Sequence, residues 1–208
     1  MNNIKSLPLD KAEWKTSLES YQNEVPHLGK FTLRPFDLAQ DIAWLHEWVN
    51  LPYAVYWQLQ QTSVTEVYNT YREIDSSPHV CVCVGELNGL TKFLVEFYHA
   101  SEDRVAAHFD AKEGDYGFHI LIGPPDQPQP QFTWHVFRTI MDFLFANPEV
   151  DRLVVEPDIN NDKIHKLNKR AGFQYDKKIT FPEKTAYLAF CTRQDYRIAC
   201  QHSGTTNQ

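Results

Sequence analysis

The fold can be worked out from residues 117–124, which read Gly117-Phe118-His119-Ile120-Leu121-Ile122-Gly123-Pro124. This run is apolar apart from one histidine and has the length of a buried strand. After a proline-rich loop, residues 132–145 place apolar side chains at helical spacing. Residues 153–155, Leu-Val-Val, then read as another buried strand. Strand, helix and strand in this order predict a right-handed crossover between two parallel strands.

The residues upstream predict a strand, two helices and a hairpin. Residues 31–35 read as a strand that a proline ends, and Asp37 is placed to cap the helix that follows. Ser63-Val64-Thr65-Glu66 has the spacing of a capping box at the start of a second helix. Residues 79–98 read as two β-rich segments joined at Asn88-Gly89, which is typical of a hairpin turn.

The residues downstream of the crossover complete the sheet. We expect a helix over residues 160–171 with Gly172 just after its end, because glycine favours that left-handed position. Residues 173–180 and 185–191 read as two closing strands, and residues 105–110 as a short additional strand. The sequence therefore predicts an α/β (α+β) fold, with helices on both faces of a mixed sheet.

Length and composition favour one globular domain. A chain of 208 residues suits a single domain over 31–196, with an N-terminal extension over 1–30 and a flexible polar tail over 197–208. The net charge of −7 and the lack of a basic stripe argue against nucleic-acid binding. Neither a secretory segment nor a membrane-spanning apolar run is visible, so we expect a cytoplasmic protein whose four cysteines are reduced.

Two sets of motifs carry a resemblance to a known family. Residues 167–173, Leu-Asn-Lys-Arg-Ala-Gly-Phe, look like the final helix of GNAT N-acyltransferases running into the next strand. A narrower likeness covers about residues 31–196 and rests on segments 117–124, 143–145, 155–160 and 182–186. These segments resemble the acyltransferases of aerobactin, alcaligin and mycobactin biosynthesis.

The resemblance implies a fold and an activity. The fold would be the GNAT fold, whose mixed, mostly antiparallel central sheet has splayed central strands. The activity would be transfer of an acetyl or succinyl group from acetyl-CoA or succinyl-CoA to an N-hydroxylated diamine or N6-hydroxylysine. The product would be a hydroxamate for siderophore biosynthesis and iron acquisition. The implied partner is a small hydroxylamine or amine, and no metal or membrane is implied.

His119 and Asp158 are the candidate catalytic residues. An imidazole is largely neutral at pH 7 and can accept the proton that an attacking amine releases. The resembling enzymes use a histidine at this position near the amine. Asp158 follows a buried strand and Pro157, where it can orient His119 or hold the substrate nitrogen. The alternatives are a hydrogen-bonded core histidine and an aspartate that caps the helix near Asn160.

Coenzyme A would bind along the end of the His119 strand and the loop that follows it. Backbone N–H groups near Leu121 or Ile122 would stabilise the thioester oxyanion. GNAT enzymes carry a glycine-rich loop before the long helix, but here Pro130 and Phe132 replace its small residues. The candidate CoA-binding residues in this region are Leu121, Ile122, Gly123, Gln127, Gln131, Phe132 and Thr133.

A second departure from the family lies on the last helix. Many GNAT enzymes have a tyrosine four residues before the Gly-Phe glycine, aimed at the CoA sulfur, where this chain has Asn168. An asparagine cannot act as an acid, so it could only donate a hydrogen bond to the thiolate. Asn160 and Asn161 are candidates for contacts with the pantetheine arm, and helix capping is the alternative for both.

The amine substrate would be bound by Trp57, Glu96 and Tyr98. Glu96 can anchor an ammonium group and Trp57 can wall an aliphatic chain, while a surface glutamate and a core tryptophan are the alternatives. His79, Cys81 and Cys83 share one face of a strand, as simple alternation also predicts. We expect no metal there, since the spacing is not that of a zinc site.

Two other functions stay open at this stage. One is N-acetylation of a primary amine, such as lysine or an aminoglycoside. The other is a non-catalytic GNAT-like module that binds a ligand or partner, which the proline-filled loop and Asn168 would favour. Lys184 matches the family pattern, and a contact with a carboxylate or a phosphate is the one role that we can offer for it. The chain is expected to be a monomer or a homodimer.

Overall fold

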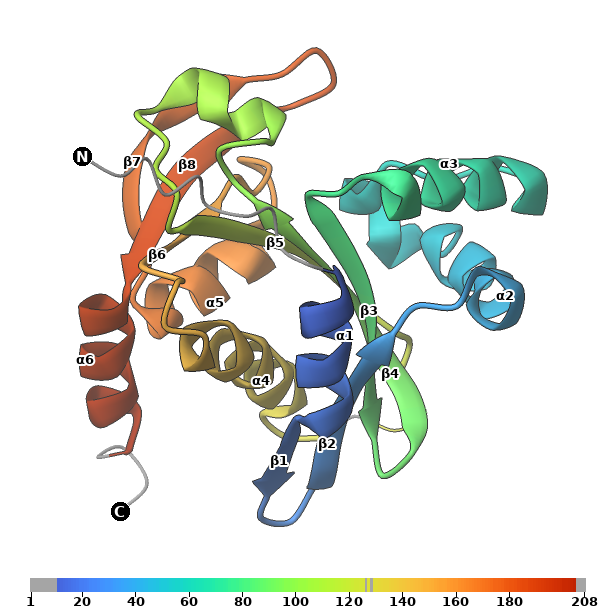
Figure 1. Ribbon diagram of the computed structural model, residues 1–208, viewed down its shortest axis with the longest axis horizontal. Coiled ribbons are helices and arrows are strands. Elements are labelled where there is room, and N and C mark those ends of the chain that lie inside the picture. The colour runs from blue at the N-terminus through green and yellow to red at the C-terminus, as the bar shows by residue number, and fades with distance from the viewer. Residues whose placement is uncertain (1–10, 126, 128, 205–208) are drawn as a thin grey trace. The chain divides into compact units, whose positions relative to one another are not determined.

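The computed structural model describes residues 11–125, 127 and 129–204 (Figure 1). The chain divides into two compact units, which we describe separately. The first unit contains the chain as far as His99 together with His119–Thr133, and the second contains Ala100–Phe118 and the chain from Trp134 onward. Strand β5 (Asp115–Ile122) runs from the second unit into the first.

The first unit contains the N-terminal helices and an antiparallel part of the sheet. Its elements are α1 (Lys11–Ser20), β1 (Gln22–Val25), β2 (Gly29–Pro35), α2 (Leu38–Val49), the 3₁₀ helix η1 (Pro52–Trp57), α3 (Val64–Ser76), β3 (Val80–Leu87) and β4 (Leu90–His99). The second unit contains the elements of the crossover and the C-terminal hairpin. They are the 3₁₀ helix η2 (Arg104–His108), most of α4 (Phe132–Ala146), β6 (Arg152–Val155), α5 (Asp162–Ala171), β7 (Gln174–Thr180), β8 (Thr185–Thr192) and α6 (Arg193–Gly204).

The strands form the mixed, mostly antiparallel sheet that the sequence predicted. Their order is β1-β2-β3-β4-β5-β6-β8-β7. Strands β5 and β6 pair in parallel, with Tyr116 opposite Leu153, and helix α4 lies between them in sequence. The pairs β1–β2, β2–β3, β3–β4, β6–β8 and β7–β8 are antiparallel. The predicted crossover between parallel strands is therefore confirmed.

Helices cover both faces of the sheet in the first unit (Figure 1). On one face α1 contributes the buried Trp14, whose ring centroid lies 5.2 Å from that of Phe97. Helices α2, η1 and α3 cover the other face, where their apolar side chains meet those of β3, β4 and β5. That core consists of Leu45, Val49, Ala54, Val67, Tyr71, Val82, Val84, Leu94 and Leu121.

Local sequence signals give the predicted turns and caps. The Asp37 side chain accepts a hydrogen bond from the Ala39 amide, 2.8 Å away, at the start of α2. Ser63 and Glu66 form both hydrogen bonds of the capping box. Gly172 ends α5 at a φ of 97°, in the left-handed region that favours glycine. These signals are confirmed because each depends on neighbours within a few residues.

The ends of the chain differ from the sequence-based expectation. Residues 11–30 were interpreted as an extension, yet they supply α1 and β1, whose buried Trp14, Leu18 and Val25 join the first unit. Residues 197–204, expected to be a loose tail, continue helix α6. Thr192 and Asp195 cap that helix reciprocally, since each backbone amide donates to the side chain of the other.

The short strand expected at 105–110 is the 3₁₀ helix η2 instead. Asp103 precedes it, and its side chain accepts a hydrogen bond from the Val105 amide at 2.8 Å, which starts a turn.

In the second unit, the aromatic rings of Phe118, Phe137 and Phe173 pack together edge to face, with 5.4–6.5 Å between their centroids. In the part of the chain that the structure describes, no helix combines the length and apolar character that crossing a membrane requires.

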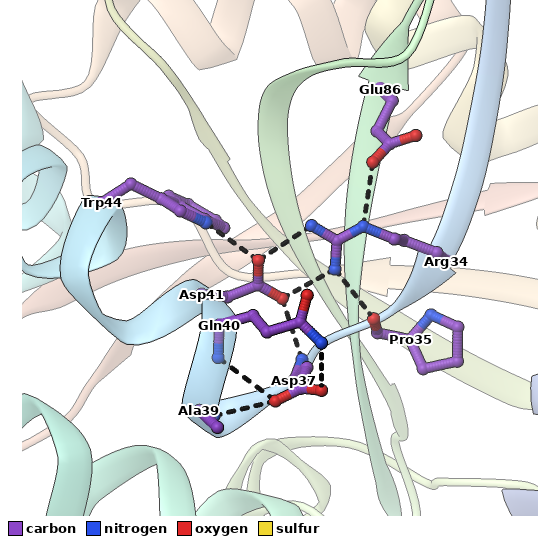
Figure 2. A network of polar contacts seen from close by, with 8 residues as sticks. All are labelled: Arg34, Pro35, Asp37, Ala39, Gln40, Asp41, Trp44 and Glu86. Carbon is purple, nitrogen blue, oxygen red and sulfur yellow. Dashed lines mark hydrogen bonds and ion pairs between the residues drawn. The ribbon is translucent and has the colours of Figure 1, made fainter.

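A buried ion pair holds the start of α2 against the strands (Figure 2). The Arg34 guanidinium donates to both carboxylate oxygens of Asp41, at 2.7 and 2.8 Å, and to Glu86 at 2.9 Å. Asp41 also accepts the Asp37 amide and the Trp44 indole N–H. The Asp41 side chain is only 3% exposed, so this contact joins β2, β3 and α2 through one shielded carboxylate.

Candidate functional site

The first unit places His119 beside a glutamate. His119 lies on β5 and Glu96 on β4, and Nδ1 of the imidazole is 3.1 Å from Oε2 of the carboxylate. The Glu96 side chain is 12% exposed, whereas that of His119 is 38% exposed. His119 is therefore not sealed in the core, and its imidazole has a carboxylate partner on one nitrogen.

Two further side chains extend this contact away from His119. The Tyr71 hydroxyl on α3 lies 2.9 Å from Oε1 of Glu96, and the Trp57 indole nitrogen at the end of η1 lies 3.0 Å from the same hydroxyl. On the other side of His119, the Tyr98 ring lies with its centroid 4.9 Å from that of the imidazole. Burial and the nearby Glu96 charge raise the pKa of Tyr71 well above its usual value.

The three residues predicted to bind the amine thus lie together around His119. Trp57 reaches it through Tyr71 and Glu96, while Tyr98 touches its ring. Both carboxylate oxygens of Glu96 already accept a hydrogen bond from the protein, which favours a role in orienting His119. Tyr71 was not among the residues predicted for the site. Its hydroxyl was the available signal, because a buried tyrosine usually has a hydrogen-bond partner.

Asp158, the other predicted catalytic residue, has partners in the second unit. Its Oδ1 accepts the Asn160 amide at 2.8 Å and the Asn160 side-chain amide at 3.0 Å. Its backbone forms an isolated antiparallel bridge with Ala186. The alternative offered by the sequence was an N-cap at Asp158, but helix α5 begins at Asp162 with Asn161 as its cap, and Asp158 instead holds the turn before it. The catalytic role of Asp158 stays a prediction.

The two asparagines predicted to contact the pantetheine arm also form hydrogen bonds with residues close to them in the sequence. Asn161, rather than Asp158, is the N-cap of α5, and its Oδ1 accepts the Ile164 amide at 3.3 Å. Asn160 is exposed and donates to Asp158. The helix therefore starts two residues later than the sequence suggested, because asparagine is favoured at the cap and not inside the first turn.

Lys184 contacts the Glu-Pro-Asp segment, residues 156–158, of the second unit. Its ammonium donates to the Glu156 carbonyl at 2.9 Å and lies 3.2 Å from the Glu156 carboxylate. The two side chains are 13% and 3% exposed. The pair joins the end of β6 to the turn that precedes β8, which gives Lys184 a structural role that the sequence alone did not reveal.

We expect Lys184→Met to lower the free energy of unfolding by about 3 kcal/mol, because it would leave the buried Glu156 carboxylate without its cation. Chemical denaturation at pH 7 measures this loss. The double variant Lys184→Met/Glu156→Gln should recover part of it, since no buried charge is then left unpaired. Equal stability of wild type and Lys184→Met would contradict the assignment.

Asn168 carries an unpartnered acceptor in the second unit. The residue is 1% exposed, and its side-chain nitrogen donates to the Tyr175 hydroxyl at 3.3 Å. That hydroxyl lies 2.7 Å from Nδ1 of His165. Within the described residues, Oδ1 of Asn168 has no hydrogen-bond partner. A buried, unpaired carbonyl oxygen fits a ligand N–H, such as an amide of the pantetheine arm.

The predicted CoA-binding residues between 121 and 133 differ in how far they are available to a ligand. The Gly123 amide already donates to the Lys92 carbonyl at 2.8 Å, and the Phe132 amide lies 3.2 Å from the Gln129 carbonyl. Those two amides are therefore engaged within the protein. Leu121 is buried in the core with Ile122 partly exposed, while Gln127, Gln131 and Thr133 are exposed. Residues 126 and 128 lie outside the described chain.

Glycine at 123 has a packing reason of its own. A Cβ built there would lie 2.3 Å from the Trp48 indole, so any larger residue would displace that ring. Gln131 adopts a left-handed φ of 62° just before α4. This shows that the helix start is reached without a glycine, by a turn that an ordinary residue adopts only at some cost.

A basic cluster lies on α4 and α5. Burial lowers the pKa of His135, and so do the charges of Arg138 and Arg170. Burial, together with the charge of Arg138, also lowers the pKa of Arg170, whose guanidinium stacks 4.0 Å from the Trp134 ring. Asp142 lies 3.7 Å from Arg138 and raises its pKa, so the lowered values of His135 and Arg170 are what favour an anion nearby. The described residues contain no cluster of three His, Cys, Asp or Glu suited to a metal.

Comparison with known proteins gives consistent results. A family model described as "Acetyltransferase (GNAT) domain" matches residues 37–181, well over half of the chain. The N-hydroxyputrescine acetyltransferase of Acinetobacter baumannii is 26% identical over 187 residues, which are 89% of this chain and 89% of that protein. The N(6)-hydroxylysine O-acetyltransferase of Escherichia coli is 26% identical over 86% of this chain, which spans 57% of that relative.

A solved structure supports the fold. The aminoglycoside acetyltransferase AAC(6')-Ib, determined in complex with coenzyme A, matches with a TM-score of 0.71 and 24% identity. The match covers 81% of this chain and 98% of that one. At this identity the likeness concerns the architecture only.

Proposed function

Because the chain belongs to the GNAT acetyltransferase family and is an acyl-CoA N-acyltransferase, we propose that it acylates an N-hydroxylated amine. The acyl donor would be acetyl-CoA or succinyl-CoA. The acceptor would be an N-hydroxylated diamine or N6-hydroxylysine, and the product a hydroxamate for siderophore biosynthesis. Both relatives described above carry names for enzymes acting on N-hydroxylated amines, and one of them matches over nearly its whole length.

The observation that carries the proposal is the half-exposed His119 bonded to the shielded Glu96. The ionised carboxylate accepts the hydrogen on Nδ1, which leaves Nε2 as the basic nitrogen. A hydroxylamine nitrogen is less basic than that of an alkylamine and is already neutral at pH 7. A weak base such as an imidazole is then sufficient to accept the proton that this nitrogen loses when it attacks the thioester.

The reaction can be written with these groups. The amine nitrogen attacks the thioester carbonyl carbon, and the carbonyl oxygen becomes an oxyanion. Nε2 of His119 takes the proton from the attacking nitrogen. The carbon–sulfur bond then breaks, the carbonyl forms again as an amide, and the thiolate leaves with a proton from water or the imidazolium. Backbone N–H groups of Leu121 and Ile122 remain our candidates for the oxyanion.

Several residues are proposed to hold the acyl donor. The unpartnered Oδ1 of Asn168 would accept an amide N–H of the pantetheine arm, with Tyr175 and His165 fixing the asparagine. Arg138 and Arg170 offer positive charge for the phosphates, since both lie close enough to His135 to lower its pKa. The exposed Gln127, Gln131 and Thr133 and the cap residues Asn160 and Asn161 stay predicted contacts. A role for Asp158 in orienting the substrate also stays a prediction.

A panel of acceptors tests the substrate. We expect acylation of N-hydroxyputrescine, N-hydroxycadaverine or N6-hydroxylysine to exceed that of the matching unhydroxylated amine at pH 7, because only the hydroxylated nitrogen is largely neutral there. Each amine is offered with acetyl-CoA and with succinyl-CoA. Mass spectrometry identifies the product, and release of the free thiol gives the rate.

The same panel decides between the alternatives. Turnover of lysine or of an aminoglycoside such as kanamycin, without turnover of any hydroxylated amine, would replace the proposed acceptor by a primary amine. Calorimetric binding of CoA without turnover of any amine would favour a non-catalytic binding module. A cytoplasmic location and a monomeric or homodimeric state remain predictions, which fractionation and sedimentation measure.

A further inference from the structure

The contact between His119 and Glu96 is one end of a longer chain of hydrogen bonds. It runs from the Trp57 indole to the Tyr71 hydroxyl at 3.0 Å, then to Oε1 of Glu96 at 2.9 Å, and from Oε2 to Nδ1 of His119 at 3.1 Å. The four residues come from η1, α3, β4 and β5. Their atoms are thus held by four different elements of the first unit.

The direction of each hydrogen bond follows from the chemistry of the groups. An indole nitrogen can only donate, so the Tyr71 oxygen accepts from Trp57. The single hydroxyl hydrogen is then available for the Glu96 carboxylate, which can only accept when ionised. Burial and the Glu96 charge keep the pKa of Tyr71 far above neutrality, so its hydroxyl stays protonated as a donor. Glu96 therefore receives two fixed donors, one of which is Nδ1–H of His119.

We propose that Tyr71 is a positioning residue for His119. Its hydroxyl, held in turn by the Trp57 indole, keeps Glu96 in the rotamer that accepts Nδ1–H, and this makes Nε2 the basic nitrogen. Tyr71 is fully buried, and its ring packs 5.3 Å from that of Phe36. The hydroxyl is thus part of a rigid element, as precise positioning requires.

The inference rests on the proposed function only where activity is measured. Without the Tyr71 hydroxyl, one carboxylate oxygen of Glu96 would be buried and unsatisfied, and the side chain would turn toward another donor. The imidazole would then lose its fixed partner. Fewer molecules would carry the proton on Nδ1, and the imidazolium formed during reaction would be less stabilised.

Tyr71→Phe removes only the hydroxyl and keeps the packed ring. We expect kcat to fall about tenfold, with an unchanged KM for the acyl donor, because the variant alters the base and not the donor site. The midpoint of the acidic limb of kcat/KM should move to lower pH, as the imidazolium is less stabilised. Glu96→Gln should move it in the same direction and further. Tyr68→Phe is the matched control, since it removes an exposed hydroxyl from the same helix.

A double variant tests whether the hydrogen bonds of Trp57 and Tyr71 act in series on Glu96. Trp57→Phe should lower kcat less than Tyr71→Phe does, because the hydroxyl would keep its bond to Glu96. In Tyr71→Phe the Trp57 indole already has no hydroxyl to hold, so adding Trp57→Phe should cause no further loss and the double variant should match Tyr71→Phe alone. Simple addition of the two losses would overturn the serial arrangement.

Nuclear magnetic resonance of the imidazole gives a readout independent of turnover. With ¹⁵N-labelled histidine, and with His119 assigned from the signal lost in His119→Gln, the wild type should show its proton on Nδ1. Tyr71→Phe should show a mixture of tautomers, and Tyr68→Phe should not. An unchanged tautomer and an unchanged pH midpoint in Tyr71→Phe would overturn the inference, even if kcat falls. If the wild type acylates no amine, the proposed function fails, but this spectrum still tests whether Tyr71 positions His119 through Glu96.

Discussion

Replacing His119 by glutamine is expected to lower kcat/KM for the hydroxylated amine by about 10²–10⁴-fold, the usual contribution of a general base. The glutamine side chain keeps hydrogen-bonding groups near Glu96 but cannot take up a proton at neutral pH. The loss should be smaller for a hydroxylamine than for an alkylamine, because the second must shed an ammonium proton before it attacks. Initial rates of thiol release over pH 5–9 measure the effect.

A matched variant shows whether the loss belongs to this histidine. His27 is exposed in the turn between β1 and β2 at a φ of 70°, so His27→Asn suits its left-handed backbone and should keep wild-type activity. Binding of CoA to His119→Gln should also be unchanged. If His119→Gln retains full activity, another group is the base, and Asp158→Asn becomes the next variant to measure.

Replacing Arg34 by methionine is expected to lower the free energy of unfolding by about 3–5 kcal/mol, which is typical when a buried ion pair loses one partner. Asp41 would keep the Asp37 amide and the Trp44 indole N–H but lose the guanidinium that donates to both of its oxygens (Figure 2). Urea denaturation at pH 7 measures the change. The double variant Arg34→Met/Asp41→Leu should be more stable than Arg34→Met, because no charge is then buried alone.

The same ion pair predicts how stability depends on pH. Burial alone would raise the pKa of Asp41, but the hydrogen bonds from Arg34, Asp37 and Trp44 together lower it below its usual value. A carboxylate with a lowered pKa stabilises the fold above about pH 4, and that stability is lost as the pH falls through the folded-state value. The unfolding curves of wild type and Arg34→Met should therefore converge below about pH 4. A constant difference down to pH 2 would contradict this account.

Much of the fold could be predicted because its signals are local. The cap at Asp37, the capping box at Ser63 and the left-handed Gly172 each depend on a few neighbouring residues. The strand, helix and strand from 117 to 155 also follow from apolar spacing. The ends of the chain were less predictable. In α1, Trp14 and Leu18 make the buried contact within a mostly polar helix.

The sequence predicted several residues of the site, but it did not predict which of them contact one another. His119 stood out as one polar residue in an apolar strand, and Trp57, Glu96 and Tyr98 were named for the substrate. No spacing rule relates residue 57 to 71, or 96 to 119, because these contacts join separate elements. The sequence instead offered Asp158 as the carboxylate for His119, since it comes at the end of the neighbouring strand in the crossover.

Short stretches of adjacent residues were enough to identify the family, the helices and strands of the crossover, and the histidine at its centre. The packed fold was needed to show that Glu96 accepts from His119, that Tyr71, bonded to Trp57, donates to Glu96, and that Lys184 neutralises Glu156. A buried polar group needs a partner, and it finds one wherever the packed elements place it. That partner is set by strand register and helix packing, which a linear pattern does not contain.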